Sequence, residues 1–278
     1  ALLFGSILPL QVNAQKDTDQ TIAEKANVTL PQPTDNLATN VEKVPERKSL
    51  EKLLSINPEE NESLPSQSTA LPDFNNIKNT NERKQRFIQY MKPFINAENA
   101  SILRDRYLVI QLYKGTKNGD PLNKKDEEWL QEKAKYYRVA KKIFPAEEAF
   151  LDLLMHMDII PMDLAIAQAI NESAWGTSRF ARMGNNMFGQ WCFKPGCGIV
   201  PAQRKEGATH EVAAFRTVAG SVESYMHHVN SHPAYRQLRY LRYQQRLDGK
   251  NPDGHTIALG LQKYSAIGMK YVNILRSL

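Results

Sequence analysis

The sequence has little of what defines several common protein classes. It has two cysteines among 278 residues, and it has neither a His-Glu-x-x-His metal motif nor a glycine-rich phosphate loop. After the first ten residues, no segment reaches the ~18 consecutive apolar residues that a membrane span needs. We find no internal repeat and no run of alternating strands and helices. We therefore expect no membrane span, no bound metal and no cofactor.

Aromatic residues are absent from Gln15 to Leu71, where polar residues and proline prevail. Such a composition buries too little apolar surface to offset the entropy lost on folding, so residues 15–72 are predicted to be a disordered linker. Residues 1–14 differ, because an apolar run, ALLFGSILPL, is followed by small residues at positions that signal peptidase favours. They predict the remnant of a signal peptide and export to the periplasm or cell envelope.

The two cysteines, Cys192 and Cys197, enclose Phe-Lys-Pro-Gly. Their spacing fits neither a Cys-x-x-Cys redox centre nor a four-ligand zinc site. In an exported protein a disulfide is the simpler interpretation, and Pro195-Gly196 supplies the chain reversal that it needs. We expect the bridge to fix the local shape of a loop.

The formal net charge of +6 suits an anionic partner, but charge alone does not distinguish nucleic acid from a polymer that carries carboxylates. Four arginines are grouped in one stretch: Arg236, Arg239, Arg242 and Arg246. We interpret them as a solvated helix face rather than a nucleic-acid patch, so no nucleic-acid partner is expected.

Apolar residues recur at helical spacing from about residue 73 onward. The pattern predicts two helices between Phe87 and Tyr113, a third within 121–142, a fourth at 146–157 and further helices at 220–230 and 233–247. A shorter piece after Pro201 has β-hairpin character. The fold class is therefore predicted to be mainly α with a small β-hairpin, divided into an N-terminal helical part (73–157) and a catalytic core (158–278).

One helix carries a candidate catalytic acid. Pro161 suits a first helical turn and Gly176 a helix end, which places Glu172 in the last turn. Glu172 then continues a face formed by small or uncharged residues: Ala165, Gln168 and Ala169. Burial there would raise its pKa and keep it protonated, as a general acid requires. The competing interpretation is a solvated salt bridge at the end of the helix.

Aromatic and amide side chains follow this glutamate within twenty residues. Sugar sites need flat apolar faces for the rings and amides for hydroxyl and acetamido groups. The segment supplies both, so we predict a carbohydrate site lined by Trp175, Asn185, Asn186, Phe188 and Trp191.

The strings Glu-Ser-Ala-Trp-Gly-Thr-Ser (172–178) and Asn-Asn-Met-Phe-Gly (185–189) resemble the signatures of glycoside hydrolase family 73, the β-N-acetylglucosaminidases of bacterial cell walls. Within that family the sequence is similar to the Bax-type proteins. Later matching positions include Phe215-Arg216, Tyr225, Tyr264-Ser265, Gly268 and Tyr271, so the resemblance covers roughly residues 158–278.

The resemblance implies a lysozyme-like fold and cleavage of the β-1,4 bond between N-acetylglucosamine and N-acetylmuramic acid in peptidoglycan glycan strands. It also implies that Glu172 is the general acid and that Asn186, Phe188 and Tyr264 line the sugar site.

The second catalytic group is where this sequence departs from the family pattern. Members often have a glutamate on a β-hairpin before the Phe-Arg position, but here two residues compete, Glu206 and Glu211, and Glu211 lies nearer that landmark. Alternatively, the acetamido group of the substrate acts as the nucleophile and Tyr264 orients it.

Other classes remain open at this stage. A muramidase or a lytic transglycosylase of lysozyme-like fold would also need a single essential glutamate, and a non-catalytic wall-binding module would need none. A metal hydrolase built on His227, His228 and His232 is a weaker alternative, since Pro233 predicts a helix boundary at His232.

Overall fold

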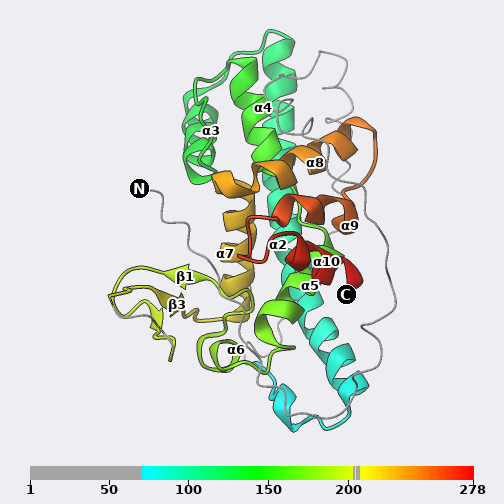
Figure 1. The fold of residues 1–278 in the computed structure, drawn as a ribbon. Coiled ribbons are helices and arrows are strands. Elements are labelled where there is room, and N and C mark those ends of the chain that lie inside the picture. The colour runs from blue at the N-terminus through cyan, green and yellow to red at the C-terminus, as the bar shows by residue number, and fades with distance from the viewer. Residues whose placement is uncertain (1–70, 203, 205–206) are drawn as a thin grey trace.

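The computed structural model describes residues 71–202, 204 and 207–278 (Figure 1). The expected signal-peptide remnant, nearly all of the expected linker and Glu206 lie outside the described residues. The described chain is mainly α-helical, which confirms the predicted fold class. Its α-helices are α2 (Thr80–Lys117), α3 (Lys124–Tyr136), α4 (Glu147–His156), α5 (Met162–Ser173), α6 (Arg179–Gly184), α7 (Val218–Ser231), α8 (Arg236–Leu247), α9 (Gly254–Ile257) and α10 (Met269–Ser277). The 3₁₀ helices are η2 (Phe74–Asn76), η3 (Pro233–Tyr235) and η4 (Ala258–Leu261).

The longest helix, α2, continues through Pro93, where we expected two helices. A proline inside a helix removes a backbone hydrogen bond and costs ~3 kcal/mol. The apolar period continues on both sides of it, however, and Phe87, Met91, Ile102 and Val109 are all buried. Burial against α4, α5 and α7 offsets the local cost. Despite its length α2 is too polar to cross a bilayer, and none of the other described helices meets that requirement.

Helix α5 packs against α2, α9 and α10. Ala165 and Ala169 are fully buried, and their small side chains let neighbouring elements approach closely. The helix ends at Ser173, whose hydroxyl accepts a hydrogen bond from the amide of Gly176 at 2.8 Å. Gly176 has φ of +74°, and a Cβ there would lie 2.7 Å from the ring of Phe74, so glycine is required. Glu172 therefore lies in the last turn of α5, as predicted.

The β structure is a three-stranded antiparallel sheet of order β1–β3–β2, formed by β1 (Trp191–Cys192), β2 (Gly198–Ile199) and β3 (Glu211–Ala213). Trp191 pairs with Val212 on one side of β3, and Ile199 pairs with Val212 on the other. The predicted hairpin after Pro201 was thus misplaced, because two of the strands precede Pro201. These strands are too short to show a period of two, so the sequence pattern did not reveal them.

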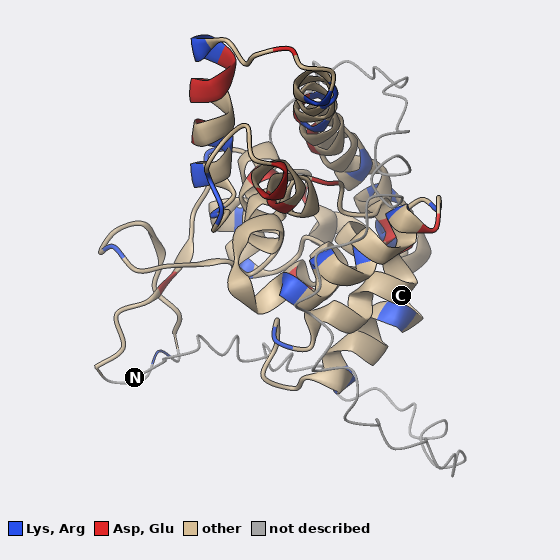
Figure 2. Cartoon of the chain, turned by 90° about the horizontal axis from the view of Figure 1, so that it is seen from above, with Lys and Arg blue, Asp and Glu red and all other residues tan. Residues whose placement is uncertain are grey.

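The arginines of α8 are not a solvated face, contrary to our interpretation. Arg239, Arg242 and Arg246 are buried, and Arg236 alone of the four is exposed. Their guanidinium groups donate to backbone carbonyls and to a buried carboxylate, Asp158. Figure 2 shows Lys and Arg spread over several helices, with Asp and Glu among them. The arginines of this stretch therefore form hydrogen bonds and ion pairs in the interior of the fold.

Candidate active site

Glu172 lies among four buried tyrosines that come from different parts of the chain. Tyr225 is on α7, Tyr235 on η3, Tyr264 follows η4 and Tyr271 is on α10. Burial is the largest cause that raises the pKa of each of these phenols, and the Glu172 carboxylate adds to the shift. The described chain thus surrounds the acid with polarisable rings and hydroxyl groups.

Burial raises the pKa of the Glu172 carboxyl, and two hydrogen bonds oppose this shift. The hydroxyl of Tyr271 is one donor, and Nδ2 of Asn171 donates to Oε1 at 3.1 Å. Desolvation penalises the charged form of an acid, so the protonated form persists to higher pH than in a free glutamate. A carboxyl group shifted in this direction is better suited to donate a proton than a free glutamate is.

The loop that follows α6 lies against this carboxylate. Gly189 has φ of +62°, and a Cβ added to it would lie 3.2 Å from Oε2 of Glu172. Glycine is therefore favoured at this position both by the left-handed backbone and by the close approach of the Glu172 carboxylate. The main chain here forms one wall of the site.

Asn186 holds that loop in place. It is buried, its Nδ2 donates to the carbonyls of Gln190 (3.0 Å) and Ala213 (2.8 Å), and its Oδ1 accepts from the amides of Phe188 and Gln190. These bonds use its polar atoms within the protein. Asn186 thus connects the loop to β3 and fixes the position of the main chain that forms one wall of the site.

The other predicted sugar-site residues divide into two groups. Phe188 is fully buried and stacks on Tyr225 with ring centroids 3.8 Å apart, and Asn185 ends α6 and donates to the carbonyl of Phe215 at 3.0 Å. Trp175 and Trp191 are only partly buried. The two tryptophans are therefore the members of the set that keep exposed ring surface for a ligand.

Each tryptophan rests on a second side chain. Trp175 meets Phe87 edge to face at 6.0 Å, and Trp191 stacks on His210 at 4.1 Å. The Nζ of Lys84 also lies over the Trp175 ring, 5.2 Å from its centroid. Such contacts fix a ring in one orientation. This arrangement is suited to stacking against a sugar ring.

Tyr264 is buried, and its hydroxyl donates to the carbonyl of Phe188 at 3.0 Å. Its ring lies parallel to that of Tyr271, with centroids 5.4 Å apart. Tyr264 thus supports the loop beside the acid, whereas Tyr271 contacts the acid itself. Sequence reasoning did not assign a role to Tyr271 or Gly189, although both stand among the residues that carry the family resemblance.

Glu211 lies beside the disulfide loop. Cys192 and Cys197 are joined, with Cα atoms 6.2 Å apart. The Glu211 carboxylate accepts hydrogen bonds from the amide of Gly196 (3.0 Å), within the loop that they close, and from the amide of Gly198 (2.8 Å), just after it. These amides lower the pKa of Glu211. Each carboxylate oxygen is therefore already engaged in holding the loop.

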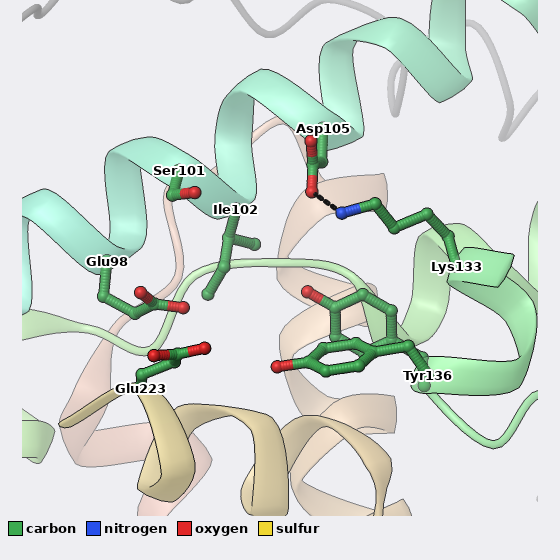
Figure 3. Close-up of a pocket in the computed structure, with 8 residues that line it drawn as sticks. Glu98, Ser101, Ile102, Asp105, Lys133, Tyr136 and Glu223 are labelled. Carbon is green, nitrogen blue, oxygen red and sulfur yellow. Dashed lines mark hydrogen bonds and ion pairs between the residues drawn. The ribbon is translucent and has the colours of Figure 1, made fainter. Parts of the chain in front are cut away.

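A second group of carboxylates lines a pocket of about 250 Å³ between α2, α3 and α7 (Figure 3). Glu98 and Glu223 point toward each other there, and Lys133 is paired with Asp105. Burial and then the charge of Glu223 raise the pKa of Glu98. A facing pair of acids is a possible hydrolytic site on chemical grounds, so it has to be weighed against Glu172.

Comparison with known proteins bears on both sites. A family model described as Glucosaminidase, mannosyl-glycoprotein endo-beta-N-acetylglucosaminidase, matches residues 147–278. This range contains Glu172, Gly189 and all four tyrosines around the acid. Of the pocket between α2, α3 and α7 it contains Glu223 but not Glu98, Asp105 or Lys133. The fold and the site therefore define a glycoside hydrolase whose candidate acid is Glu172.

Comparison with a whole protein identifies the group to which the chain belongs within that family. Over 209 residues the sequence is 32% identical to Protein bax of Escherichia coli (strain K12). The aligned region makes up 75% of this chain and 73% of that protein. The chain belongs to the Bax-type group of glycoside hydrolase family 73. No solved structure matches it.

Proposed function

We propose that the protein is a peptidoglycan hydrolase that cleaves the β-1,4 bond between N-acetylglucosamine and N-acetylmuramic acid, with Glu172 as general acid. The observation that carries this proposal is a partly buried carboxyl of raised pKa, surrounded by tyrosines and lying within the matched glucosaminidase region. Trp175 and Trp191 would stack against sugar rings. Export to the periplasm or cell envelope, which the apolar residues 1–10 support, would bring the enzyme to its substrate.

The chemistry begins with protonated Glu172 beside the glycosidic oxygen. Its proton moves to that oxygen as the bond to the anomeric carbon breaks, and positive charge develops on the sugar ring. The carboxylate left behind is stabilised by the hydrogen bonds from Tyr271 and Asn171. It can then take a proton from the water that attacks in the second half of the reaction.

The nucleophile in our proposal is the acetamido oxygen of the substrate. Both oxygens of Glu211 accept backbone amides, which makes this carboxylate a poor attacking group. The hydroxyl of Tyr264 donates to Phe188 and keeps an acceptor lone pair with which it could orient an acetamido N–H.

Mass spectrometry of digested sacculi tests the reaction itself. We expect muropeptides that end in reducing N-acetylglucosamine. Reducing N-acetylmuramic acid would instead identify a muramidase, and 1,6-anhydro-muramic ends would identify a lytic transglycosylase. No released product from an intact, folded enzyme would identify a wall-binding module.

Substitution of Glu211 by Gln tests the choice of nucleophile. The glutamine side chain has one acceptor oxygen in place of two, so either Gly196 or Gly198 loses its hydrogen bond. We expect faster hydrogen exchange at one of these amides and glycan cleavage within a few-fold of wild type. A loss of ~10² or more in rate, with amide protection unchanged, would make Glu211 the catalytic carboxylate instead.

A further inference from the structure

Gln168 connects two of the tyrosines around the acid. It is fully buried and precedes Glu172 by one helical turn on α5. Its Oε1 accepts a hydrogen bond from the Tyr225 hydroxyl at 2.6 Å, and its Nε2 donates to the Tyr271 hydroxyl at 3.1 Å. The hydroxyl of Tyr271 in turn lies close enough to the carboxyl of Glu172 to act on its pKa through a side-chain hydrogen bond. The described chain thus contains a continuous series from Tyr225 through Gln168 and Tyr271 to Glu172.

The direction of the hydrogen bonds in this series follows from the Glu172 carboxylate at its end. An ionised carboxylate can only accept, so Tyr271 must donate to it. The oxygen of Tyr271 is then free to accept, and the amide nitrogen of Gln168 supplies the proton. This leaves the amide oxygen of Gln168 facing Tyr225, whose hydroxyl donates to it. Each hydrogen bond of the series then has one donor and one acceptor when Glu172 is charged.

We propose that Tyr271, held by Gln168 and Tyr225, is the positioning residue that aims the Glu172 carboxyl and stabilises its charged form after the proton has left. This inference rests on the proposed role of Glu172 and adds residues that act through it. The support comes from three elements, since Tyr225 is on α7, Gln168 on α5 and Tyr271 on α10. A buried amide between two hydroxyls has few alternative arrangements, which fixes the donor in place.

Tyr264 does not perform this task, although it lies parallel to Tyr271. Its hydroxyl proton is directed at the carbonyl of Phe188. The groups that act on the Glu172 carboxyl are neutral in the ordinary pH range: Tyr225, Tyr235, Tyr264, Tyr271 and Asn171. With no cation among them, hydrogen bonds are the main means by which the site stabilises the carboxylate against burial.

The pH dependence of glycan cleavage by Tyr271→Phe tests the proposal. The general acid works only when protonated, so activity falls as the pH rises through its pKa. Removing a donor to the charged form raises that pKa, and the alkaline limb of the pH–rate profile should move to higher pH. We expect kcat at the wild-type optimum to fall about tenfold, because the carboxyl is no longer held in one orientation.

Two further variants, one in the same series and one control, accompany this experiment. Gln168→Met keeps the length of the side chain but cannot donate to Tyr271, so its alkaline limb should move in the same direction by a smaller amount. Tyr243→Phe is the matched control, because Tyr243 is a buried tyrosine on α8 whose hydroxyl has no hydrogen-bond partner in the described chain. Its pH profile should equal that of the wild type. Circular dichroism establishes that each variant is folded, and Gln168→Met tests the same series if Tyr271→Phe fails to fold.

A direct titration separates this inference from the proposed function. The carboxyl ¹³C resonance of Glu172, assigned by its loss in Glu172→Gln, reports the pKa without any turnover. A higher pKa in Tyr271→Phe supports the positioning role even if the wild type does not cleave glycan. An unchanged pKa together with an unchanged pH profile would overturn it even if the enzyme is fully active.

Discussion

Glu172→Gln is expected to reduce cleavage of purified sacculi by a factor of ~10² or more, the range typical of losing a positioned general acid. The amide of glutamine keeps the shape of the side chain and still reaches Tyr271 and Asn171, but it has no proton that can be transferred to the glycosidic oxygen. The helical circular dichroism signal should remain that of the wild type, because Glu172 is only partly buried and makes no ion pair in the described chain.

Glu223→Gln provides the matched control for this experiment. It makes the same chemical change at a carboxylate of the pocket between α2, α3 and α7. This variant should cleave sacculi at the wild-type rate. If the two results were exchanged, so that Glu172→Gln stayed within tenfold of wild type and Glu223→Gln did not, the acid would have to be moved to the Glu98 and Glu223 pair.

The helix that carries the acid could be predicted because its two ends are marked locally. Pro161 precedes the first turn, and Gly176 occupies a left-handed position that other residues adopt with strain. The period of small residues between them indicated a buried face, and Ala165 and Ala169 are indeed fully buried. A raised pKa for Glu172 followed from the same pattern, and burial is its largest cause.

The partners of the acid could not be predicted from local patterns. Tyr271 reaches Glu172 because α10 packs beside α5, and Tyr225 reaches Gln168 from α7. The sequence does not show which of several tyrosine hydroxyls faces the carboxylate. Glu211 is a similar case. Its neighbours along the chain do not reveal that the amides of Gly196, in the disulfide loop, and of Gly198, just after it, point to its carboxylate.

The buried arginines show a different limit. Cations spaced three or four residues apart form one face of a helix whether that face meets water or the interior. Arg242 donates to the carbonyls of Met155, His156 and Ile159 at the end of α4, and these acceptors become available only when α4 and α8 are packed together. Composition and spacing therefore could not distinguish a solvated stripe from this internal arrangement.

Asp158→Asn tests that arrangement, and we expect it to lower the free energy of unfolding by about 3–5 kcal/mol, the scale of breaking a buried ion pair. Asp158 is buried, and Arg246 forms two hydrogen bonds with it, at 2.9 and 3.1 Å. Arg106 and Arg242 lie 4.0 Å from the same carboxylate. The neutral amide would leave three buried guanidinium groups without their shared counter-ion. The segment that they hold leads directly into α5, so catalysis should decline with stability.

Urea denaturation at several pH values measures this effect, with Asp105→Asn as the control. Asp105 pairs with Lys133 at a partly exposed position, where the same substitution should cost less than about 1 kcal/mol.

Burial alone would raise the pKa of Asp158, but Arg106, Arg246 and Arg242 outweigh it and hold the pKa well below its usual range. A depressed folded-state pKa contributes stability above the unfolded-state value of about 3.9 and loses it as the pH falls below that value. The difference between wild type and Asp158→Asn should therefore be constant near neutral pH and shrink in acid. A difference that is small at pH 7, or that grows as the pH falls, would show that the three arginines do not depend on Asp158.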